Sequence, residues 1–316
     1  MTRPRLVMLR PLGLGDLLTG IPAMRAAARA FPQHERLLAA PAVLTPLALL
    51  SRAVDEVVDV QPHQPLPPSC QQPDIAIDLH GRGPASQRVL LATRPRRLIA
   101  FANEEVPETR GFPRWRDDEH EVRRWCRLML ENGIEADPAD LDLHAPGIAV
   151  PRLARGAAVV HPGAAYPARR WPAERWARVA ASLAPDVLIT GGPAERSLAM
   201  RVADRAGIDP ARVLAGRTDL LELAAIVGAA RLVVSGDTGV AHLATAMRTP
   251  SVVLFGPTSP ARWGPPSERH WHRVIWKGRE GNPNAMEPDP GLLAIGVEDV
   301  LLAIANLREA SHAVRA

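Results

Sequence analysis

The sequence has 316 residues, of which 47% are hydrophobic and 23% are charged, and its formal net charge is +4. Such a composition belongs to a folded protein rather than a disordered chain, and the length suggests two domains of roughly 150 residues. Two cysteines exclude a multi-disulfide scaffold or a cysteine-rich zinc site, and 4% aromatic residues are too few for a base-stacking groove, so we expect no nucleic-acid partner.

Short apolar runs alternate with longer segments of helical period along the first half of the chain, which is typical of a parallel α/β fold. The predicted strands are Leu6–Arg10, Arg36–Ala39, Val57–Val60, Asp74–Leu79 and Arg97–Phe101. The predicted helices are Leu17–Ala30, Pro41–Ala53, Ala85–Ala92 and Glu119–Glu131.

Glycine and proline residues interrupt regular structure over Asn132–Arg155, where we place a linker between two domains. The α/β pattern then restarts, with predicted strands at Ala157–His161, Val187–Thr190, Arg231–Ser235 and Ser251–Phe255. Further helices are predicted at Ala173–Leu183, Ala194–Ala206, Leu220–Gly228, Val240–Met247 and Glu298–Glu309. We therefore expect an N-terminal domain, residues 1–150, and a C-terminal domain, residues 151–316, with a cleft between them and the last helix packed on either one.

The loop after the first predicted strand contains Gly13 and Gly15 and leads to Asp16 at the start of a helix. Glycines let a backbone approach a ligand closely, and a helix N-terminus favours negative charge. A dinucleotide-binding loop needs a third glycine where Leu18 stands, so a nicotinamide cofactor is disfavoured and no cofactor is predicted. Asp16 has two interpretations, an N-cap of the helix or a general base at the carboxyl end of a strand.

Loops that follow strands in the second half also offer groups for an anion. Gly163 lies just after one strand and Arg169 shortly before the next helix, which is a plausible anion pocket; solvated surface arginines are the alternative. The strand-to-helix turn at Gly192 carries Glu195, which either meets a ribose hydroxyl or favours the helix dipole.

The strongest local cluster follows the third predicted strand of the second half. It contains Asp237, Thr238, Gly239 and, one helical turn later, His242, so that helix amides and an imidazole face one ligand. Donors of this type stabilise a diphosphate, although a lone histidine with a structural role is the alternative. Because no second histidine or cysteine stands at chelating spacing, no metal site is predicted.

Three blocks of the sequence resemble, in order and spacing, the ADP-heptose–lipopolysaccharide heptosyltransferases of glycosyltransferase family 9. The first is Leu9–Phe31, with Gly15-Asp16 and Thr19–Ala23. The second runs from His161-Pro162-Gly163 to Arg170-Trp171-Pro172, and the third comprises Gly236–Ala244, Pro250, Leu254–Thr258 and Trp263–Pro265. Each block alone is weak, but jointly they cover most of the chain.

The resemblance implies a GT-B fold, in which two Rossmann-like α/β domains face each other across a cleft, the N-terminal one holding the acceptor and the C-terminal one the nucleotide sugar. It implies that Asp16 is the catalytic base and that Glu195 lies near the ribose. It places the donor diphosphate at Arg169, which stands where a lysine is common, and at Asp237, Thr238, Gly239 and His242. Close backbone approach to the substrates is expected at Gly13, Gly15, Gly163 and Gly192.

The implied function is inverting, metal-independent transfer of a heptose from an ADP-linked donor to a hydroxyl of a glycan or glycolipid acceptor, in lipopolysaccharide biosynthesis. No apolar stretch is long enough for a signal-peptide core or a membrane span, so we expect a cytoplasmic monomer, with contact at the inner face of a membrane left open. The alternatives are a nucleotide-sugar epimerase or hydrolase on the same scaffold and a non-catalytic nucleotide-sugar binding protein.

Overall fold

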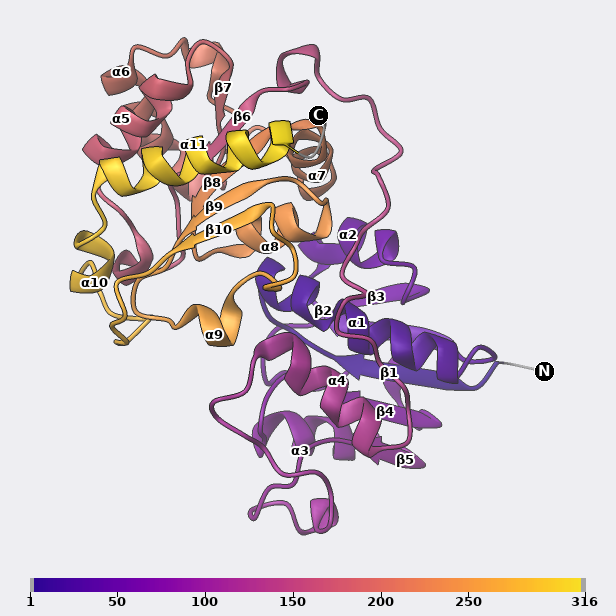
Figure 1. The fold of residues 1–316 in the computed structure, drawn as a ribbon. Helices are drawn as coiled ribbons and strands as arrows, with labels where there is room; N and C mark the ends of the chain where they lie inside the picture. Colours follow the sequence, from indigo (N-terminus) through magenta and orange to yellow (C-terminus); the bar gives the residue numbers. More distant parts are fainter. Residues whose placement is uncertain (1–2, 314–316) are drawn as a thin grey trace. The chain divides into compact units, whose positions relative to one another are not determined.

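The computed structural model describes residues 3–313 of the chain and the surroundings of the side chains of residues 3–307. The chain divides after His144, shortly before the boundary expected at residue 150, into two compact units. Each unit is built on its own five-stranded parallel sheet (Figure 1). The predicted α/β class with two Rossmann-like units is thereby confirmed.

The first unit has the strand order β3-β2-β1-β4-β5. Its elements are β1 (Arg5–Leu9), α1 (Leu14–Ala30), β2 (Glu35–Ala40), α2 (Thr45–Leu50), β3 (Glu56–Asp59), β4 (Ile75–Asp78), α3 (Ala85–Ala92), β5 (Arg97–Ile99) and α4 (Glu121–Glu131). On one face of the sheet, Val7, Leu9 and Ala76 pack in one cluster with Leu90 of α3. This buried apolar packing holds the carboxyl ends of β1 and β4 side by side, since Leu9 pairs with Asp78.

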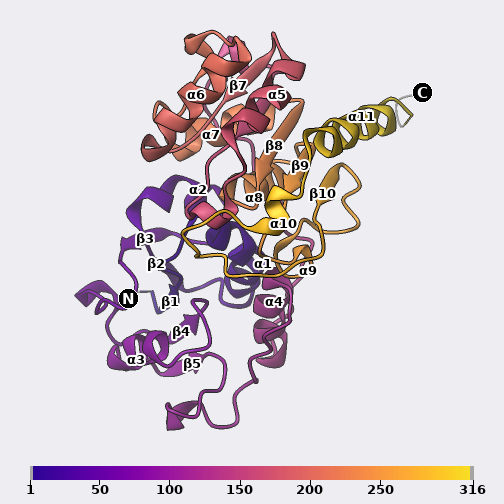
Figure 2. The same ribbon diagram turned by 90° about the vertical axis from the view of Figure 1, so that its left-hand side faces the viewer.

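The second unit has the strand order β10-β9-β8-β6-β7. Its strands are β6 (Ala158–His161), β7 (Val187–Ile189), β8 (Leu232–Gly236), β9 (Ser251–Leu254) and β10 (His272–Ile275). Its helices are α5 (Ala173–Leu183), α6 (Arg196–Ala206), α7 (Leu220–Ala229), α8 (Gly239–Ala246), α9 (Pro260–Trp263), α10 (Pro290–Leu293) and α11 (Val297–Ala313). Helix α11 packs on α5 and beside β9 and β10, all within this unit (Figure 2).

Most predicted elements are present within three residues of their expected ends, but two differ for clear reasons. The helix expected over Pro41–Ala53 is a 3-10 turn followed by the short α2, because Pro46 fits only the first turn of a helix. Strand β10 was not predicted, since its sequence His-Arg-Val-Ile has only two adjacent apolar residues, and it lies at the edge of the described sheet beside β9. Among the described residues, no helix combines the length and hydropathy needed to cross a bilayer.

Candidate active site

In each unit, the predicted site residues lie in the loops and first helical turns that follow the carboxyl ends of strands. In the first unit, β2 and β3 lie on one side of β1, and β4 and β5 lie on its other side, so the strand order reverses between β1 and β4. In the second unit, β7 lies on one side of β6, and β8, β9 and β10 lie on the other, so the order reverses between β6 and β8. Open parallel sheets bind ligands outside the carboxyl ends of strands at such a switch point. Helix α1, which carries Asp16 in its first turn, follows β1, whereas Gly163 follows β6 and Asp237 follows β8. Each unit therefore presents its candidate residues where its topology favours a ligand.

Asp16 lies in the first turn of α1, which begins three residues earlier than expected. The N-cap is Gly13 and Gly15 lies in the first turn, so the interpretation of Asp16 as the N-cap is wrong. Its Oδ2 atom instead accepts a hydrogen bond of 3.2 Å from the Gly13 N–H. This is the contact that the third helical residue makes with the N-cap backbone in a capping box. Its side chain is 28% exposed. Burial raises the pKa of the Asp16 carboxyl, against the opposing effect of the Arg10 guanidinium.

Arg10, which sequence reasoning did not select, lies directly behind Asp16. Its side chain is fully buried, and its Nη2 atom lies 3.0 Å from Oε1 of Glu121 in α4 and 3.9 Å from Oδ1 of Asp16. The sequence shows Arg10 as an arginine that follows an apolar strand, but its partner Glu121 stands 111 positions away. Spacing along the chain therefore gave no indication of the pair.

Arg169 reaches the residue before the N-cap of α8, Asp237, although the two stand 68 positions apart in sequence. Thr238 is the N-cap of α8, yet its hydroxyl makes no capping hydrogen bond. The Thr238 Oγ1 and Arg169 Nε atoms are buried and have no hydrogen-bond partner within the described residues. Arg169 Nη1 donates a long hydrogen bond of 3.4 Å to the Asp237 carbonyl. Buried polar atoms are normally paired, so this corner is suited to a polar ligand.

The carboxyl group of Asp237 is buried beside this corner. Burial raises its pKa to about 6, while Arg169 and a hydrogen bond from the Thr258 hydroxyl act in the opposite direction. The Asp237 backbone N–H is bonded to the Leu254 carbonyl at 3.0 Å. An ionised carboxylate cannot donate a hydrogen bond to a diphosphate. The Asp237 carboxyl is instead suited to attract Arg169 by charge and to hold the loop through its hydrogen bond with Thr258.

Glu195, Gly163 and Gly192 form a second corner of the same unit. Glu195 Oε2 accepts a hydrogen bond of 2.7 Å from the Gly192 N–H and lies 3.7 Å from Nε2 of the buried His161. A Cβ atom at position 163 would lie 2.0 Å from Glu195 Oε1, so glycine is required there while Glu195 keeps its place. The loops after β6 and β7 are thus fitted to each other through Glu195.

Replacement of Gly163 by alanine is expected to displace the Glu195 carboxylate and to lower the free energy of unfolding by about 1–2 kcal/mol through the lost hydrogen bond. Chemical denaturation of wild type and Gly163→Ala measures this loss. Gly147→Ala is the matched control, since no atom lies within 4 Å of a Cβ built there. In a Glu195→Ala background the Gly163 change should be nearly neutral, and an equal loss in both backgrounds would contradict the explanation.

His242 lies on α8, where its ring makes an edge-on contact with Trp263 of α9 at a centroid distance of 5.8 Å. Thr238 and His242 therefore lie on one helix, one turn apart, as the sequence indicated. Trp263 belongs to the third resemblance block, but its contact with His242 was not predicted. This contact fixes the ring of His242 near the N-terminal half of α8.

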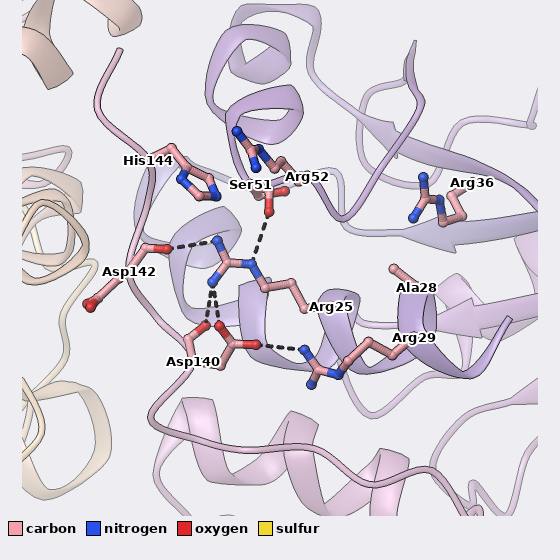
Figure 3. Close-up of a pocket in the computed structure, with 9 residues that line it drawn as sticks. All are labelled: Arg25, Ala28, Arg29, Arg36, Ser51, Arg52, Asp140, Asp142 and His144. Atoms are coloured by element: carbon pink, nitrogen blue, oxygen red, sulfur yellow. Dashed lines mark hydrogen bonds and ion pairs between the residues drawn. The ribbon is translucent and has the colours of Figure 1, made fainter. Parts of the chain in front are cut away.

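A hollow of about 480 Å³ lies at the opposite end of α1 from Asp16, within the first unit (Figure 3). Arg25 forms its centre, donating through Nε to the Ser51 carbonyl at 3.0 Å and through its terminal nitrogens to Asp140 and to the Asp142 carbonyl. Arg29 donates to the other oxygen of Asp140 at 2.8 Å. Arg25 therefore binds the last segment of the unit to α1 and to the end of α2.

Replacement of Arg25 by alanine is expected to lower the free energy of unfolding by about 2–3 kcal/mol, because several charge-assisted hydrogen bonds are lost together. Arg29→Ala is the matched control, since Arg29 is 55% exposed and, within the described residues, its ion pair is with Asp140. Its loss should stay below about 1 kcal/mol. Urea denaturation compares the variants, and equal losses would contradict the assigned role of Arg25.

In residues 3–313, no three His, Cys, Asp or Glu side chains gather in a way that could hold a metal ion. The expectation of metal-independent transfer stays a prediction.

Two Rossmann-like units, each with polar loops at its switch point, define a GT-B-type α/β protein. The family model for glycosyltransferase family 9 (heptosyltransferase) matches residues 94–290, and the chain belongs to this family.

Relatives with known names agree with this assignment. Lipopolysaccharide heptosyltransferase 1 of Salmonella typhimurium is 42% identical over 74 residues, which cover 23% of this chain and 22% of that protein. The match thus spans about a fifth of that relative. The structure is similar to that of Escherichia coli ADP-heptose lipopolysaccharide heptosyltransferase II, with a TM-score of 0.76, 23% identity and coverage of 98% and 99% of the two chains. Escherichia coli heptosyltransferase WaaC with ADP gives a TM-score of 0.70 at 20% identity, with 96% and 99% covered.

Proposed function

We propose that this protein transfers a heptose from ADP-heptose to a hydroxyl of a glycan or glycolipid, with inversion at the anomeric carbon. The observation that carries this proposal is the corner at α8, where buried polar atoms of Thr238 and Arg169 lack partners among the described residues. Family membership and the names of the similar proteins, which include ADP-heptose enzymes, support the choice of donor. The acceptor class follows from the same likeness to lipopolysaccharide heptosyltransferases.

The diphosphate of the donor binds at the N-terminus of α8 in this proposal. The backbone amides of Thr238 and Gly239 and the guanidinium of Arg169 donate to its oxygens, and the helix dipole adds favourable charge. The bond between the anomeric carbon and the β-phosphate oxygen breaks, so ADP leaves with increased negative charge. Groups fixed in advance around that charge stabilise the transition state more than the bound donor.

Asp16 is the general base of the proposed reaction. It accepts the proton of the acceptor hydroxyl as that oxygen forms a bond to the anomeric carbon on the face opposite the diphosphate. A carboxylate whose pKa is raised by burial is a stronger base than an exposed aspartate, which suits this task. Because one displacement occurs at one carbon, the configuration of the sugar is inverted.

The remaining predicted residues position the donor. Glu195 accepts a hydrogen bond from a ribose hydroxyl, Asp237 holds Arg169 by charge, and His242 lies one helical turn behind Thr238 where it donates to the diphosphate. Gly13, Gly15 and the glycines around Glu195 leave room for the substrates at the loop backbones. The protein acts as a monomer at the cytoplasmic side of the membrane in this proposal.

The experiment is an assay of purified protein with ADP-heptose and a lipopolysaccharide core oligosaccharide in the presence of EDTA. ADP release and the mass of the extended oligosaccharide are measured with and without acceptor. We expect acceptor-dependent release that EDTA leaves unchanged. Activity lost in EDTA and restored by manganese would overturn metal independence.

The same assay separates the two alternatives. Free heptose or an isomerised donor formed without acceptor would favour a hydrolase or epimerase on this scaffold. Binding of ADP or a nucleotide sugar without any turnover, across a panel of acceptors, would favour a non-catalytic binding protein. Ligand-induced thermal stabilisation measures that binding, because a ligand specific for the native state raises its apparent stability.

A further inference from the structure

Arg10 is a fully buried arginine whose guanidinium is already engaged. Its Nε atom donates to the Asp16 carbonyl at 2.5 Å, Nη1 donates to the Leu79 carbonyl, and Nη2 donates to Thr19 at 3.2 Å and to Glu121 at 3.0 Å. The guanidinium also lies over the Trp125 ring, 5.0 Å from its centroid. Every nitrogen therefore binds the protein itself, and Arg10 has a structural relation to Asp16 rather than a direct one to substrate.

The helix that carries Asp16 is adapted to Arg10. A Cβ atom at Gly20, in the interior of α1, would lie 2.9 Å from Arg10 Nε and 3.0 Å from its Cδ. Glycine destabilises a helix interior relative to alanine. At position 20, however, the absence of a Cβ atom lets the Arg10 side chain lie close against the backbone of α1. Room for Arg10 is thus a reason for glycine at this position.

Glu121 supplies the counter-charge that a buried arginine requires. It is 5% exposed and accepts hydrogen bonds from Arg10, from Trp125 Nε1 at 2.7 Å and from Arg124 Nη1. Burial raises its pKa, but these donors outweigh burial and hold the pKa below its usual range. Glu121 is therefore ionised at neutral pH and remains bound to the guanidinium.

Asp16 is close to this pair without joining it. Its Oδ1 atom lies 3.9 Å from Arg10 Nη2, beyond hydrogen-bond distance, because Nη2 donates to Glu121 and Thr19. The carboxylate accepts from the Gly13 N–H through Oδ2. Among the described residues no other residue donates to Oδ1, so this oxygen can accept from an incoming hydroxyl. A carboxylate bound directly by a guanidinium would be a weaker base.

We propose that Arg10 and Glu121 are positioning residues for Asp16: Arg10 fixes the backbone of the first turn of α1, and Glu121 occupies the guanidinium so that it does not bind the Asp16 carboxylate. The inference rests on the proposed role of Asp16 as the base. In this proposal, Arg10 and Glu121 act through Asp16 and not by contact with the substrate.

The charges around Asp16 predict the direction in which its pKa shifts when each charge is removed. Arg10 comes from the loop after β1, Glu121 and Arg124 come from α4, and Asp78 ends β4, where it interacts with the Arg10 charge. Arg10 lowers the pKa of Asp16 and Glu121 raises it. Removal of the two charges one at a time must therefore shift the titration of Asp16 in opposite directions.

The experiment compares Glu121→Gln, Arg10→Met and the double variant. The pH dependence of kcat for heptose transfer from ADP-heptose is measured together with the carboxyl ¹³C titration of Asp16, whose resonance is identified by its loss in Asp16→Asn. We expect the acid limb and the titration to move to lower pH in Glu121→Gln and to higher pH in Arg10→Met. The double variant should fall between the two single variants.

Glu119→Gln is the matched control, because Glu119 flanks the same helix and pairs with Arg127 rather than with Arg10. It should leave both readouts unmoved. Shifts in the same direction for both single variants, or no shift at all, would overturn the inference. If Arg10→Met does not fold, the double variant tests the pair, since it removes both partners of the Arg10–Glu121 pair together and leaves Arg124 bonded to backbone carbonyls. Its titration must still move less than that of Glu121→Gln.

The two readouts also separate this inference from the proposed function. Opposite shifts of the Asp16 titration without matching shifts of kcat would keep the positioning pair and reject Asp16 as the base. A pH-independent kcat in Asp16→Asn that equals the wild-type value would also reject Asp16 as the base, while the titration alone decides whether Arg10 and Glu121 position it. Fixed titration in every variant would reject the pair alone.

Discussion

Replacement of Asp16 by asparagine is expected to lower kcat for heptose transfer by about 10²–10⁴-fold, because an amide cannot accept the proton of the acceptor hydroxyl. The substitution keeps the size of the side chain, and the amide oxygen of asparagine can still accept the capping hydrogen bond from the Gly13 N–H. Stability should therefore change little. Steady-state transfer from ADP-heptose, read as ADP release, measures the effect.

Binding of ADP to the Asp16→Asn variant should stay close to that of wild type, since Asp16 lies in the first unit and the proposed diphosphate corner lies in the second. Isothermal titration with ADP provides this control. An unchanged kcat would leave Asp16 with a capping role only. A large loss of ADP affinity would instead assign Asp16 to donor binding.

Replacement of Arg169 by alanine is expected to lower kcat by about 10²–10³-fold, which is the usual effect of removing one preorganised group that stabilises developing charge. The leaving ADP gains negative charge in the transition state, and Arg169 contacts Asp237, the residue before the N-cap of α8. Arg169→Lys should recover part of the rate, since it keeps the charge but changes the donor geometry. Single-turnover rates at saturating ADP-heptose measure the chemical step.

Arg170→Ala is the matched control for this variant. Arg170 is the neighbouring arginine, but its side chain donates to the carbonyls of Ala164 and Ala165 rather than toward α8. Its rate should remain near that of wild type. Equal losses at Arg169 and Arg170 would indicate a general effect of charge or of loop folding rather than stabilisation of the leaving group.

Local patterns of the sequence predicted most of the fold. Ala85–Ala92 and Ala173–Leu183 are helices with the expected bounds, because apolar residues at helical spacing dominate there. The start of α1 was misplaced because Gly13 serves as the N-cap, a position for which glycine gives a weaker signal than aspartate. Strand β10 depends on pairing with β9, which no local pattern records.

The candidate site was also predicted only in part from the sequence. Loops after strands could be found by motif, and the resemblance added roles for residues such as Asp16 and Glu195. What local sequence could not supply are contacts across long separations, such as Arg10 with Glu121 or Arg169 with Asp237. The requirement for glycine at position 163 is of the same kind, since its cause is the side chain of Glu195.

A crystal structure of the Asp16→Asn variant with bound ADP-heptose would show where the donor binds, because this variant should hold the donor without transferring it. We expect diphosphate oxygens within hydrogen-bond distance of the Thr238 and Gly239 amides and of Arg169. We also expect residue 16 to face the side of the anomeric carbon opposite the diphosphate. A diphosphate bound away from α8, or residue 16 on the same side as the leaving group, would contradict the proposed function.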